Sequence, residues 1–278
     1  MRSSHPYFAG ETRRPLLIAH RGGCGLWPEN TLFAFRQAVH LGADILETDL
    51  HATADGNLVL IHDDTVDRTT DGSGKVNRMT VSDLQNLDAG YRWSADGGKT
   101  FPFRGKGLTI PTLEELLRDI PHIRVNIDIK ERERSVAAEL CRMIRDFGKE
   151  HRVMVASFDS VTLTGFRSAC SGVATSASER EVKAFFYRSR LPFAGRRQYP
   201  FYALQVPQYS ARTLVVTDRF INAAHRCGLP VHAWPDNQTD GLSALMRMGI
   251  DGIITDFPDR VVSLRDATDQ AEQDGRLS

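Results

Sequence analysis

Short apolar runs that alternate with amphipathic stretches constrain the fold of this chain more than any other feature of its sequence. Nine such runs follow one another: 16–20, 44–50, 57–62, 124–130, 153–158, 172–176, 203–206, 230–234 and 252–255. Most are separated by segments of helical periodicity, several of which end in glycine, a common helix C-cap. Strand–helix units repeated over 278 residues predict an α/β protein, most simply one (β/α)₈ TIM barrel over residues 1–278. A doubly wound open sheet is the alternative.

The ninth run is one more than such a barrel uses, and its position predicts a hairpin. Asp-Gly at 55–56 is a strong two-residue turn signal between the second and third runs. The pairing set by that turn places Asp49 opposite His62 and Glu47 opposite Asp64. Cross-strand neighbours lie about 5 Å apart at Cβ. The hairpin is therefore expected to bring a carboxylate pair and a histidine together.

Two stretches interrupt the alternation. Residues 65–110 are Gly-rich and polar, with one short helical pattern at 80–88, which predicts a small subdomain inserted over one face of the barrel. Residues 183–202 combine aromatic side chains with arginines, a mixture that suits contact with a lipid surface or an acyl chain. The alternative for that second stretch is a helix and a loop packed on the barrel.

Composition and charge exclude some classes of function. The formal net charge is zero, so no global field favours nucleic acid or an anionic membrane surface. No apolar window is long enough to span a membrane, and the first residues lack the apolar core of a secretory signal. The scattered cysteines, with no C-x-x-C pair, predict reduced thiols without structural zinc. A bacterial cytoplasmic location is the expectation that follows.

Three acidic residues indicate a cation site. Glu47 and Asp49 are two apart on one strand and so share a face, where they repel each other unless a cation neutralises them. Oxygen ligands favour Mg²⁺ or Ca²⁺. Asp128 offers a third carboxylate and shares a strand face with Asn126 and Lys130. The alternatives are an exposed edge-strand pair for the first two acids and a salt bridge to Lys130 for the third.

Two histidines at the ends of apolar runs, His20 and His62, are candidates for proton transfer. A lone histidine there often has a structural role. Two of them beside a carboxylate cluster suit phosphodiester cleavage, in which one imidazole takes a proton and the other gives one. Arg21 adds a planar donor fork that matches phosphate oxygens. Its alternative role is a salt bridge, for which Glu29 is a candidate partner.

The motifs "HRGG", "PENTLFAF", "ETDLHATADGNLVLIHDD", "IPTLEELL", "NIDIK" and "GIDGIITDFP", in this order, resemble the glycerophosphodiester phosphodiesterase family. The resemblance covers most of residues 16–260. It implies a barrel of the phospholipase C-like type with an inserted subdomain. It also implies hydrolysis of glycerophosphodiesters to glycerol 3-phosphate and an alcohol, with one divalent cation.

The resemblance assigns roles to the residues that match its motifs. It implies acid–base catalysis by His20 and His62, phosphate or substrate contacts from Arg21, Lys130 and Trp234, and metal ligation by Glu47, Asp49 and Asp128. The chain departs from the family at two of its motifs. Asp128 stands where the family usually has Glu, and Pro235 stands where a Thr usually follows the tryptophan.

Other readings remain open. A lysophospholipase D-like enzyme, which would release the head group of a lysophospholipid, is the main enzymatic alternative. A non-catalytic phospholipid-binding barrel is weaker, because binding alone needs no pair of histidines beside three acids. A metal-dependent barrel enzyme acting on sugars or acids is weaker too, because no recognisable motif places a Lys or His as a carbon-acid base. Within the loop after the first run, Asn30 is the candidate helix N-cap and Glu29 the candidate anchor for Arg21.

Overall fold

Eight parallel strands form the centre of the molecule. The computed structural model describes residues 5–9, 15–131, 134–191, 198–234, 237–273 and 275. The strands are β1 (Leu16–Ala19), β2 (Ile45–Ala52), β4 (Arg124–Ile129), β5 (Val153–Ala156), β6 (Ala174–Thr175), β7 (Leu204–Pro207), β10 (Val231–Trp234) and β11 (Gly252–Thr255). They pair in the order β6-β5-β4-β2-β1-β11-β10-β7. A parallel bridge between Ser176 and Ala203 joins the two ends of this order. The predicted barrel is confirmed, and the open sheet is wrong.

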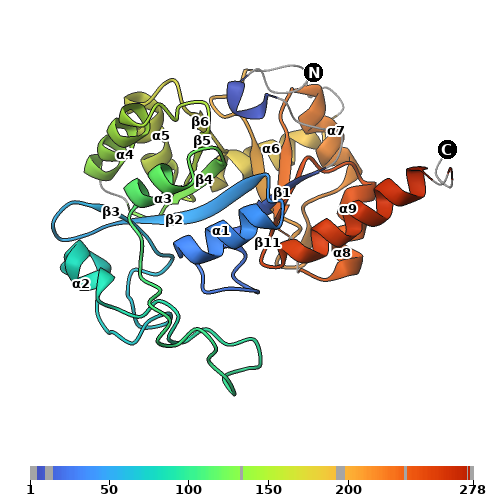
Figure 1. Ribbon diagram of the computed structural model, residues 1–278. Coiled ribbons are helices and arrows are strands. Elements are labelled where there is room, and N and C mark those ends of the chain that lie inside the picture. Colours follow the sequence, from blue (N-terminus) through green and yellow to red (C-terminus); the bar gives the residue numbers. More distant parts are fainter. Residues whose placement is uncertain are drawn as a thin grey trace.

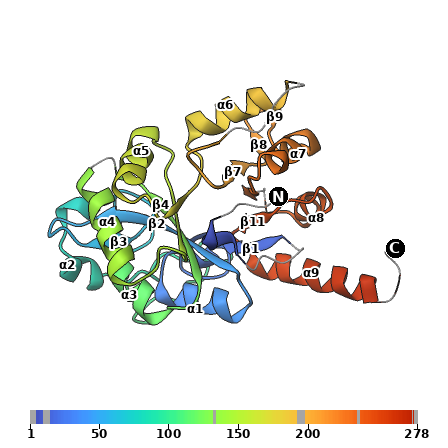
Figure 2. The same cartoon turned by 90° about the horizontal axis from the view of Figure 1, so that it is seen from above.

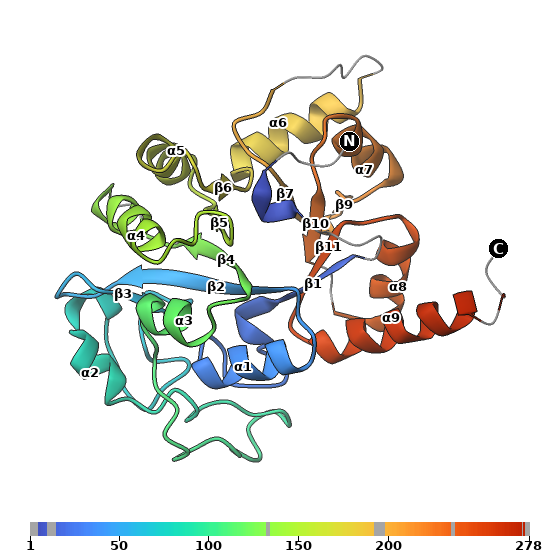
Figure 3. The same ribbon diagram turned by 45° about the horizontal axis from the view of Figure 1, so that its top comes forward.

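Helices follow the strands and lie around them (Figures 1 and 3). They are α1 (Leu32–His40), α3 (Leu113–Asp119), α4 (Arg134–Asp146), α5 (Ser160–Ala169), α6 (Glu179–Ser189), α7 (Asp218–Arg226), α8 (Thr239–Arg247) and α9 (Pro258–Gln273). In α1, the apolar spacing of the sequence buries Ala34, Phe35 and Ala38. The last helix, α9, runs away from the barrel toward the C-terminus (Figure 2).

The strands divide their side chains between the inside and the outside of the barrel. In β4, Val125, Ile127 and Ile129 belong to the apolar layer under the helices. Asn126 and Asp128 alternate with them and are also buried, so they face the interior. This alternation explains the polar pattern in "VNIDIK" and confirms that its polar residues share a face.

The amino-terminal end of the barrel is closed by apolar side chains. The short 3₁₀ helix η1 (Pro6–Phe8) places Tyr7 and Phe8 in a cluster with the inward residues of several strands, among them Ile18 and Ile45. Arg124, at the start of β4, donates to the Tyr7 carbonyl at 3.1 Å. We call this end the floor of the barrel and the opposite end its mouth.

The predicted hairpin is present, but its register differs by one residue. Strand β3 (Leu58–Leu60) lies antiparallel to β2, with Leu50 opposite Leu60. Continued along the strand, this register places Asp49 opposite Ile61, whose N–H donates to the Asp49 carbonyl at 3.1 Å. The predicted pairs of Asp49 with His62 and of Glu47 with Asp64 are therefore wrong.

The turn itself explains the shift in register. The N–H of Thr53 donates to the Asn57 carbonyl at 2.9 Å, which closes a loop of three residues rather than two. Gly56 is its last residue and has a φ of 79°, the left-handed conformation that such a loop needs. The Thr53 hydroxyl accepts the Asn57 N–H at 2.9 Å and so adds a hydrogen bond that a two-residue turn would lack.

Between β3 and α3 the chain forms the predicted insertion, which extends from the barrel on the side opposite η1 (Figure 1). It contains η3 (Val76–Arg78) and α2 (Val81–Gln85), the latter within the predicted helical stretch. Its own apolar cluster includes Val66, Val76 and Leu84. The Trp93 indole donates to the Cys24 carbonyl at 3.0 Å, so the insertion contacts the loop after β1.

Two of the four cysteines are not free thiols. Cys141 in α4 and Cys170 after α5 form a disulfide, with their Cα atoms 5.6 Å apart. The prediction of reduced thiols is wrong for this pair, because strand order places two neighbouring helices side by side and brings together cysteines 29 residues apart. The expectation of a cytoplasmic location loses that argument and stays a prediction.

The remaining elements follow β7. A small two-stranded sheet consists of β8 (Tyr209–Ser210) and β9 (Thr213–Leu214). Among the helices of the described ranges, none has the length and apolar character needed to cross a membrane.

Candidate active site

The loop after β1 delivers the first histidine and arginine to the mouth. His20 begins the 3₁₀ turn η2 (His20–Gly22), and Arg21 has a φ of 50°, which is uncommon for a residue with a side chain. Two hydrogen bonds hold Arg21 there: its N–H donates to Glu47 at 2.9 Å, and its carbonyl accepts the Asn30 N–H at 2.9 Å. A Cβ on Gly22 would lie 2.9 Å from the Cβ of Ala34, so only glycine lets α1 approach this turn.

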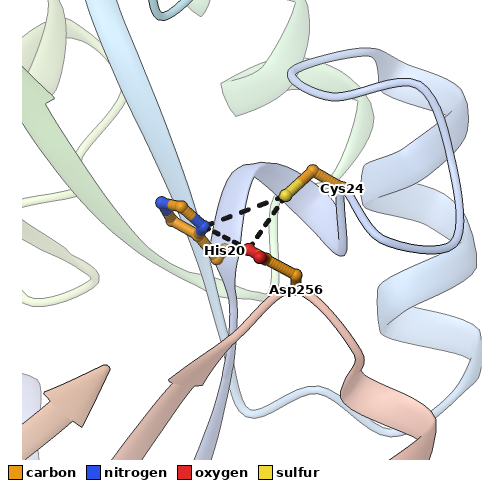
Figure 4. A group of neighbouring side chains, drawn as sticks. All are labelled: His20, Cys24 and Asp256. Atoms are coloured by element: carbon orange, nitrogen blue, oxygen red, sulfur yellow. Dashed lines mark hydrogen bonds and ion pairs between the residues drawn. The ribbon is translucent and has the colours of Figure 1, made fainter. Parts of the chain in front are cut away.

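His20 is fixed by a carboxylate that was not predicted as a site residue. Its Nδ1 donates to Asp256 Oδ1 at 2.5 Å (Figure 4). The other oxygen of Asp256 accepts the Asn237 amide at 2.9 Å. Burial works to lower the pKa of His20, but Glu47 and Asp256 outweigh it and raise that pKa above its ordinary value. The sequence signal was "TDFP" after the last strand, the expected end for site residues in a barrel.

His62 has a matching arrangement at the end of the hairpin. Its Nδ1 lies 2.6 Å from Asp63 Oδ1. Arg68, from the insertion, donates to Asp63 at 2.6 Å and to both oxygens of Glu29 at 2.7 Å. The hydrogen bond from Arg68 lowers the pKa of Asp63 to about 2. We call the pairs His20–Asp256 and His62–Asp63 the two histidine dyads. Neither Asp63 nor its hydrogen bond from Arg68 was predicted from the sequence.

Backbone support for His62 comes from β2. The His51 ring contacts the His62 carbonyl at 3.1 Å through Nε2 and Glu131 at 2.9 Å through Nδ1. The hairpin therefore places His62 at the mouth, although by a different register from the predicted one.

The three predicted acidic residues all lie inside the barrel. Glu47, Asp49 and Asp128 are buried, and Asp49 pairs with Asp128 across β2 and β4. Lys130 contacts both aspartates, with its Nζ 2.6 Å from Asp128 Oδ2 and 2.9 Å from Asp49 Oδ1. The exposed-pair alternative is wrong, and the Asp128–Lys130 salt bridge is present.

The three carboxylates of this cluster differ in pKa and in their cationic partners. Burial raises the pKa of Glu47 to about 7, with the Asp49 carboxylate adding to the effect. Burial also raises the pKa of Asp128, whereas Lys130 and Arg21 lower that of Asp49. Glu47, unlike the two aspartates, has no cationic side chain of Lys or Arg within the ion-pair distance in the described part of the chain.

The carboxylate oxygens of Glu47, Asp49 and Asp128 are the kind of ligand that a hard divalent cation prefers. Asp128 Oδ1 is buried and has no hydrogen-bond partner among the described residues. An all-oxygen donor set of three carboxylates matches Mg²⁺ or Ca²⁺. Of all triads of His, Cys, Asp and Glu in the described ranges, only His20, Cys24 and Asp256 have ligand atoms within 4.8 Å of one another. The ligand atoms of Glu47, Asp49 and Asp128 are therefore not all within that distance of one another.

Asn30 belongs to the site rather than to the helix start. It is buried and donates to Asp49 Oδ2 at 3.0 Å, while its own oxygen accepts the Thr48 hydroxyl at 2.7 Å. The N-cap of α1 is Thr31, which accepts the Ala34 N–H at 3.1 Å. The predicted N-cap is therefore wrong. The predicted anchor is correct, since Arg21 donates to Glu29 at 3.0 Å.

Trp234 ends β10 at the mouth, beside an exposed apolar rim. Its ring lies 6.3 Å from that of Phe158, which is 61% exposed, and Val161 nearby in the sequence is 69% exposed. Pro235, which stands where the family usually has Thr, lies outside the described residues. Asn237, two residues later, donates to Asp256 Oδ2 at 2.9 Å.

The aromatic stretch 183–202 has two environments. Phe185 and Phe201 are buried, as expected for a helix packed on the barrel. Tyr187 and Leu191 are 68% and 61% exposed, as a lipid contact would need. Residues 192–197 lie outside the described ranges, so the lipid contact stays a prediction.

Comparison with known proteins decides the family. Residues 20–260 match the model of the glycerophosphoryl diester phosphodiesterase family. The chain belongs to this family. It is 31% identical over 256 residues to the glycerophosphodiester phosphodiesterase of Caldanaerobacter subterraneus subsp. tengcongensis, covering 90% of this chain and 98% of that one. The predicted family and the prediction of an enzyme, a phosphodiesterase, are confirmed.

Solved structures agree on the fold. The glycerophosphoryl diester phosphodiesterase domain of an uncharacterized Mycobacterium tuberculosis protein superposes with a TM-score of 0.79 at 21% identity, covering 91% of this chain and 99% of that one. An Oleispira antarctica phosphodiesterase, solved in complex with the product sn-glycerol-3-phosphate, gives a TM-score of 0.70 at 24% identity, covering 91% and 97%. Both likenesses support the barrel architecture of this family member.

Proposed function

We propose that the protein hydrolyses glycerophosphodiesters to glycerol 3-phosphate and an alcohol, with the help of one divalent cation. One observation carries this proposal. Two histidines at the mouth, His20 and His62, each have Nδ1 bound to a carboxylate, which directs both Nε2 atoms away from their partners. Two such groups suit a reaction in which one proton is removed and another is supplied.

The cation would be held by Glu47, Asp49 and Asp128. Their burial and the unpaired oxygen of Asp128 support this assignment. When bound, a divalent cation polarises a phosphoryl oxygen and neutralises charge that develops on it. Asp128 is one methylene shorter than the glutamate usual in the family, so the family does not fix which cation fits here. Mg²⁺ and Ca²⁺ are both candidates, since both bind oxygen ligands.

Arg21 and Lys130 would bind the remaining phosphate oxygens. Both are largely buried beside the acids, and ion pairs hold them there: Arg21 with Glu29 and Asp49, and Lys130 with Asp49. Arginine offers a planar fork to two oxygens, and lysine offers a compact charge. A phosphodiester brings its own negative charge and can replace part of these ion pairs. Trp234 would line the substrate side.

The two histidines would divide the proton transfers. The carboxylates on Nδ1 fix the orientation of each ring. Against the effect of burial, Glu47 and Asp256 raise the pKa of His20 and so favour its protonated form. One imidazole removes a proton from the nucleophile, either water or the neighbouring glycerol hydroxyl. The other protonates the alcohol that leaves. His20→Ala and His62→Ala should each lower kcat by about 10²-fold or more while the protein stays folded.

Product analysis tests the proposal. Purified protein is incubated with glycerophosphocholine and glycerophosphoethanolamine, in the presence of Mg²⁺, Ca²⁺ or EDTA, and released glycerol 3-phosphate is measured enzymatically. Release with at least one cation and none with EDTA is the expected result. The proposal fails if no diester yields glycerol 3-phosphate with either cation, or if either alanine variant keeps near wild-type kcat.

The exposed apolar rim supports a second candidate, a lysophospholipase D-like activity. Phe158 lies beside Trp234 at the mouth and is exposed, as is Val161 three residues later, so both could contact an acyl chain. The kcat/KM for lysophosphatidylcholine would then exceed that for glycerophosphocholine. Phe158→Ala would lower kcat/KM for the lysophospholipid only. Equal effects of that variant on both substrates, or no hydrolysis of lysophosphatidylcholine, would dismiss this second activity.

A further inference from the structure

A cluster of three different donor atoms lies behind the catalytic face of His20. Cys24 Sγ donates to Asp256 Oδ1 at 2.9 Å, the same oxygen that His20 Nδ1 contacts at 2.5 Å. The sulfur and the ring nitrogen are 3.9 Å apart (Figure 4). The proposed chemistry uses the His20–Asp256 contact but gives the thiol no task.

The donor set differs from that of the acidic cluster. An imidazole nitrogen, a thiol sulfur and one carboxylate oxygen are the ligands that Zn²⁺ and similar borderline-soft ions prefer, whereas three carboxylates prefer Mg²⁺ or Ca²⁺. A hard cation would therefore bind at the acidic cluster, on the Nε2 side of His20, and a softer cation at the cluster on its Nδ1 side.

We propose that His20 Nδ1, Cys24 Sγ and Asp256 Oδ1 form an inhibitory site for a thiophilic divalent cation such as Zn²⁺. The binding part of this inference stands on the three ligands alone. The inhibitory part rests on the function proposed above.

The ligands are already held near the required geometry. Zinc bonds to N, O and S are about 2.0–2.3 Å long, so tetrahedral ligand atoms lie a little over 3 Å apart. The contacts of 2.5 and 2.9 Å need to open by less than about 1 Å. Asn237 holds the far oxygen of Asp256, and Trp93 holds the carbonyl of Cys24.

The site is accessible to an ion from the mouth. The side chains of His20 and Asp256 are 31% and 30% exposed, and Cys24 is half-buried. Binding would displace the thiol proton and the proton between His20 and Asp256. Three protein ligands would leave a fourth position for water, as in other open zinc sites.

Binding there would stop proton transfer at His20. An ion on Nδ1 fixes the remaining ring proton on Nε2, so Nε2 has no lone pair with which to accept a proton. The same ion takes the Asp256 oxygen that orients the ring. If His20 is instead the acid, inhibition is also expected, because the Nε2–H of a metal-bound neutral imidazole is a much weaker acid than that of an imidazolium.

Cobalt binding tests the site without any substrate. Metal-free protein is titrated with Co²⁺, and the thiolate-to-cobalt charge-transfer band in the near ultraviolet is recorded. We expect the band in wild type and in Cys227→Ser, which alters the other free cysteine. We expect no band in Cys24→Ser or in Cys24→Ala. A wild-type protein without the band, or a band that persists in both Cys24 variants, overturns the proposal.

Zinc inhibition tests the consequence. Phosphodiesterase rates are measured at saturating Mg²⁺ with increasing Zn²⁺, and each variant is normalised to its own zinc-free rate. Half-inhibition of Cys24→Ser should need at least tenfold more Zn²⁺ than that of wild type or Cys227→Ser. Equal sensitivity of all three proteins overturns the inhibitory role. A cobalt band in a protein that hydrolyses no diester would instead refute the proposed function and leave the metal site standing.

Discussion

The floor and the mouth of the barrel are built by the same strands but have opposite chemistry. Strand β2 places Ile45 in the apolar floor with Tyr7 and Phe8, and two and four residues later it places Glu47 and Asp49 toward the mouth. Residues at the amino ends of barrel strands serve stability, and those at the carboxyl ends serve chemistry. Substitutions at the two ends should therefore separate activity from stability.

The largest effect is expected at the mouth. His20→Ala or His62→Ala should lower kcat by about 10²–10⁴-fold, because each removes a general acid or base. Both side chains are about one-third exposed, so the free energy of unfolding should change by less than about 1 kcal/mol. Steady-state kinetics and urea unfolding of the same preparations measure the two quantities. A large loss of stability with unchanged kcat would erase the proposed contrast between the ends.

The floor should show the reverse. Tyr7→Ala removes a fully buried aromatic side chain and should destabilise the protein by about 3–5 kcal/mol. The kcat per folded molecule should stay the same, since Tyr7 lies at the closed end. Urea unfolding gives the stability and the folded fraction of each preparation, and the steady-state kcat is divided by that fraction. Loss of kcat at full folding would show that the two ends are coupled.

His232 extends the contrast to pH. Complete burial lowers its pKa to about 4 in the folded protein, against 6.5 for an exposed histidine. Between these two pH values His232 is protonated in the unfolded chain but not in the folded protein. Lowering the pH from 6.5 to 4 therefore favours the unfolded state and lowers the free energy of unfolding. The loss from this group is at most about 3 kcal/mol.

Replacement of His232 by leucine should flatten that dependence. Its Nε2 is buried without a hydrogen-bond partner in the described part of the structure, so an apolar side chain of similar size should be tolerated at pH 7.5. Unfolding free energies measured from pH 4 to 8 compare the two proteins. An unchanged slope in His232→Leu would assign the acid sensitivity to other groups.

The regular parts of this molecule were predictable from sequence because periodicity determines them. Alternation of polar and apolar residues in "VNIDIK" places Asp128 inside the barrel, and runs with helical spacing give the surrounding helices. The hairpin was predictable, but its register was not. The extra hydrogen bonds of Thr53 favour a three-residue loop. The Asp-Gly turn signal does not reveal these hydrogen bonds, so the register could not be predicted from it.

Contacts between distant segments were the part that sequence could not provide. Asp256 contacts His20 across 236 positions, and the disulfide joins α4 to the end of α5. Arg68 reaches Glu29 from the insertion across 39 positions. Each depends on how elements pack in space, which a single chain's local patterns do not specify. The ends of barrel strands show where to search but not which pairs form.

The smallest expected effect comes from the insertion, at Arg68. Its guanidinium links Asp63, the partner of His62, to Glu29, the partner of Arg21, and so joins the two halves of the mouth. Arg68→Gln should lower kcat by about tenfold, a change of about 1.4 kcal/mol in activation free energy, because His62 is less firmly oriented.

Arg104 in the same insertion is the matched control. It is exposed and stacks on Tyr91 and Phe101, with its guanidinium 4.0 Å from each ring centroid. Its hydrogen bond goes to the Tyr91 carbonyl, and within the described ranges it pairs with none of the residues of the two histidine dyads, His20, Asp256, His62 and Asp63. Arg104→Gln should keep wild-type kcat. If both substitutions reduce kcat equally, the insertion acts on the mouth through its overall stability. If only Arg68→Gln does, the charged network of the mouth extends beyond the barrel strands into the insertion, which has no counterpart at the apolar floor.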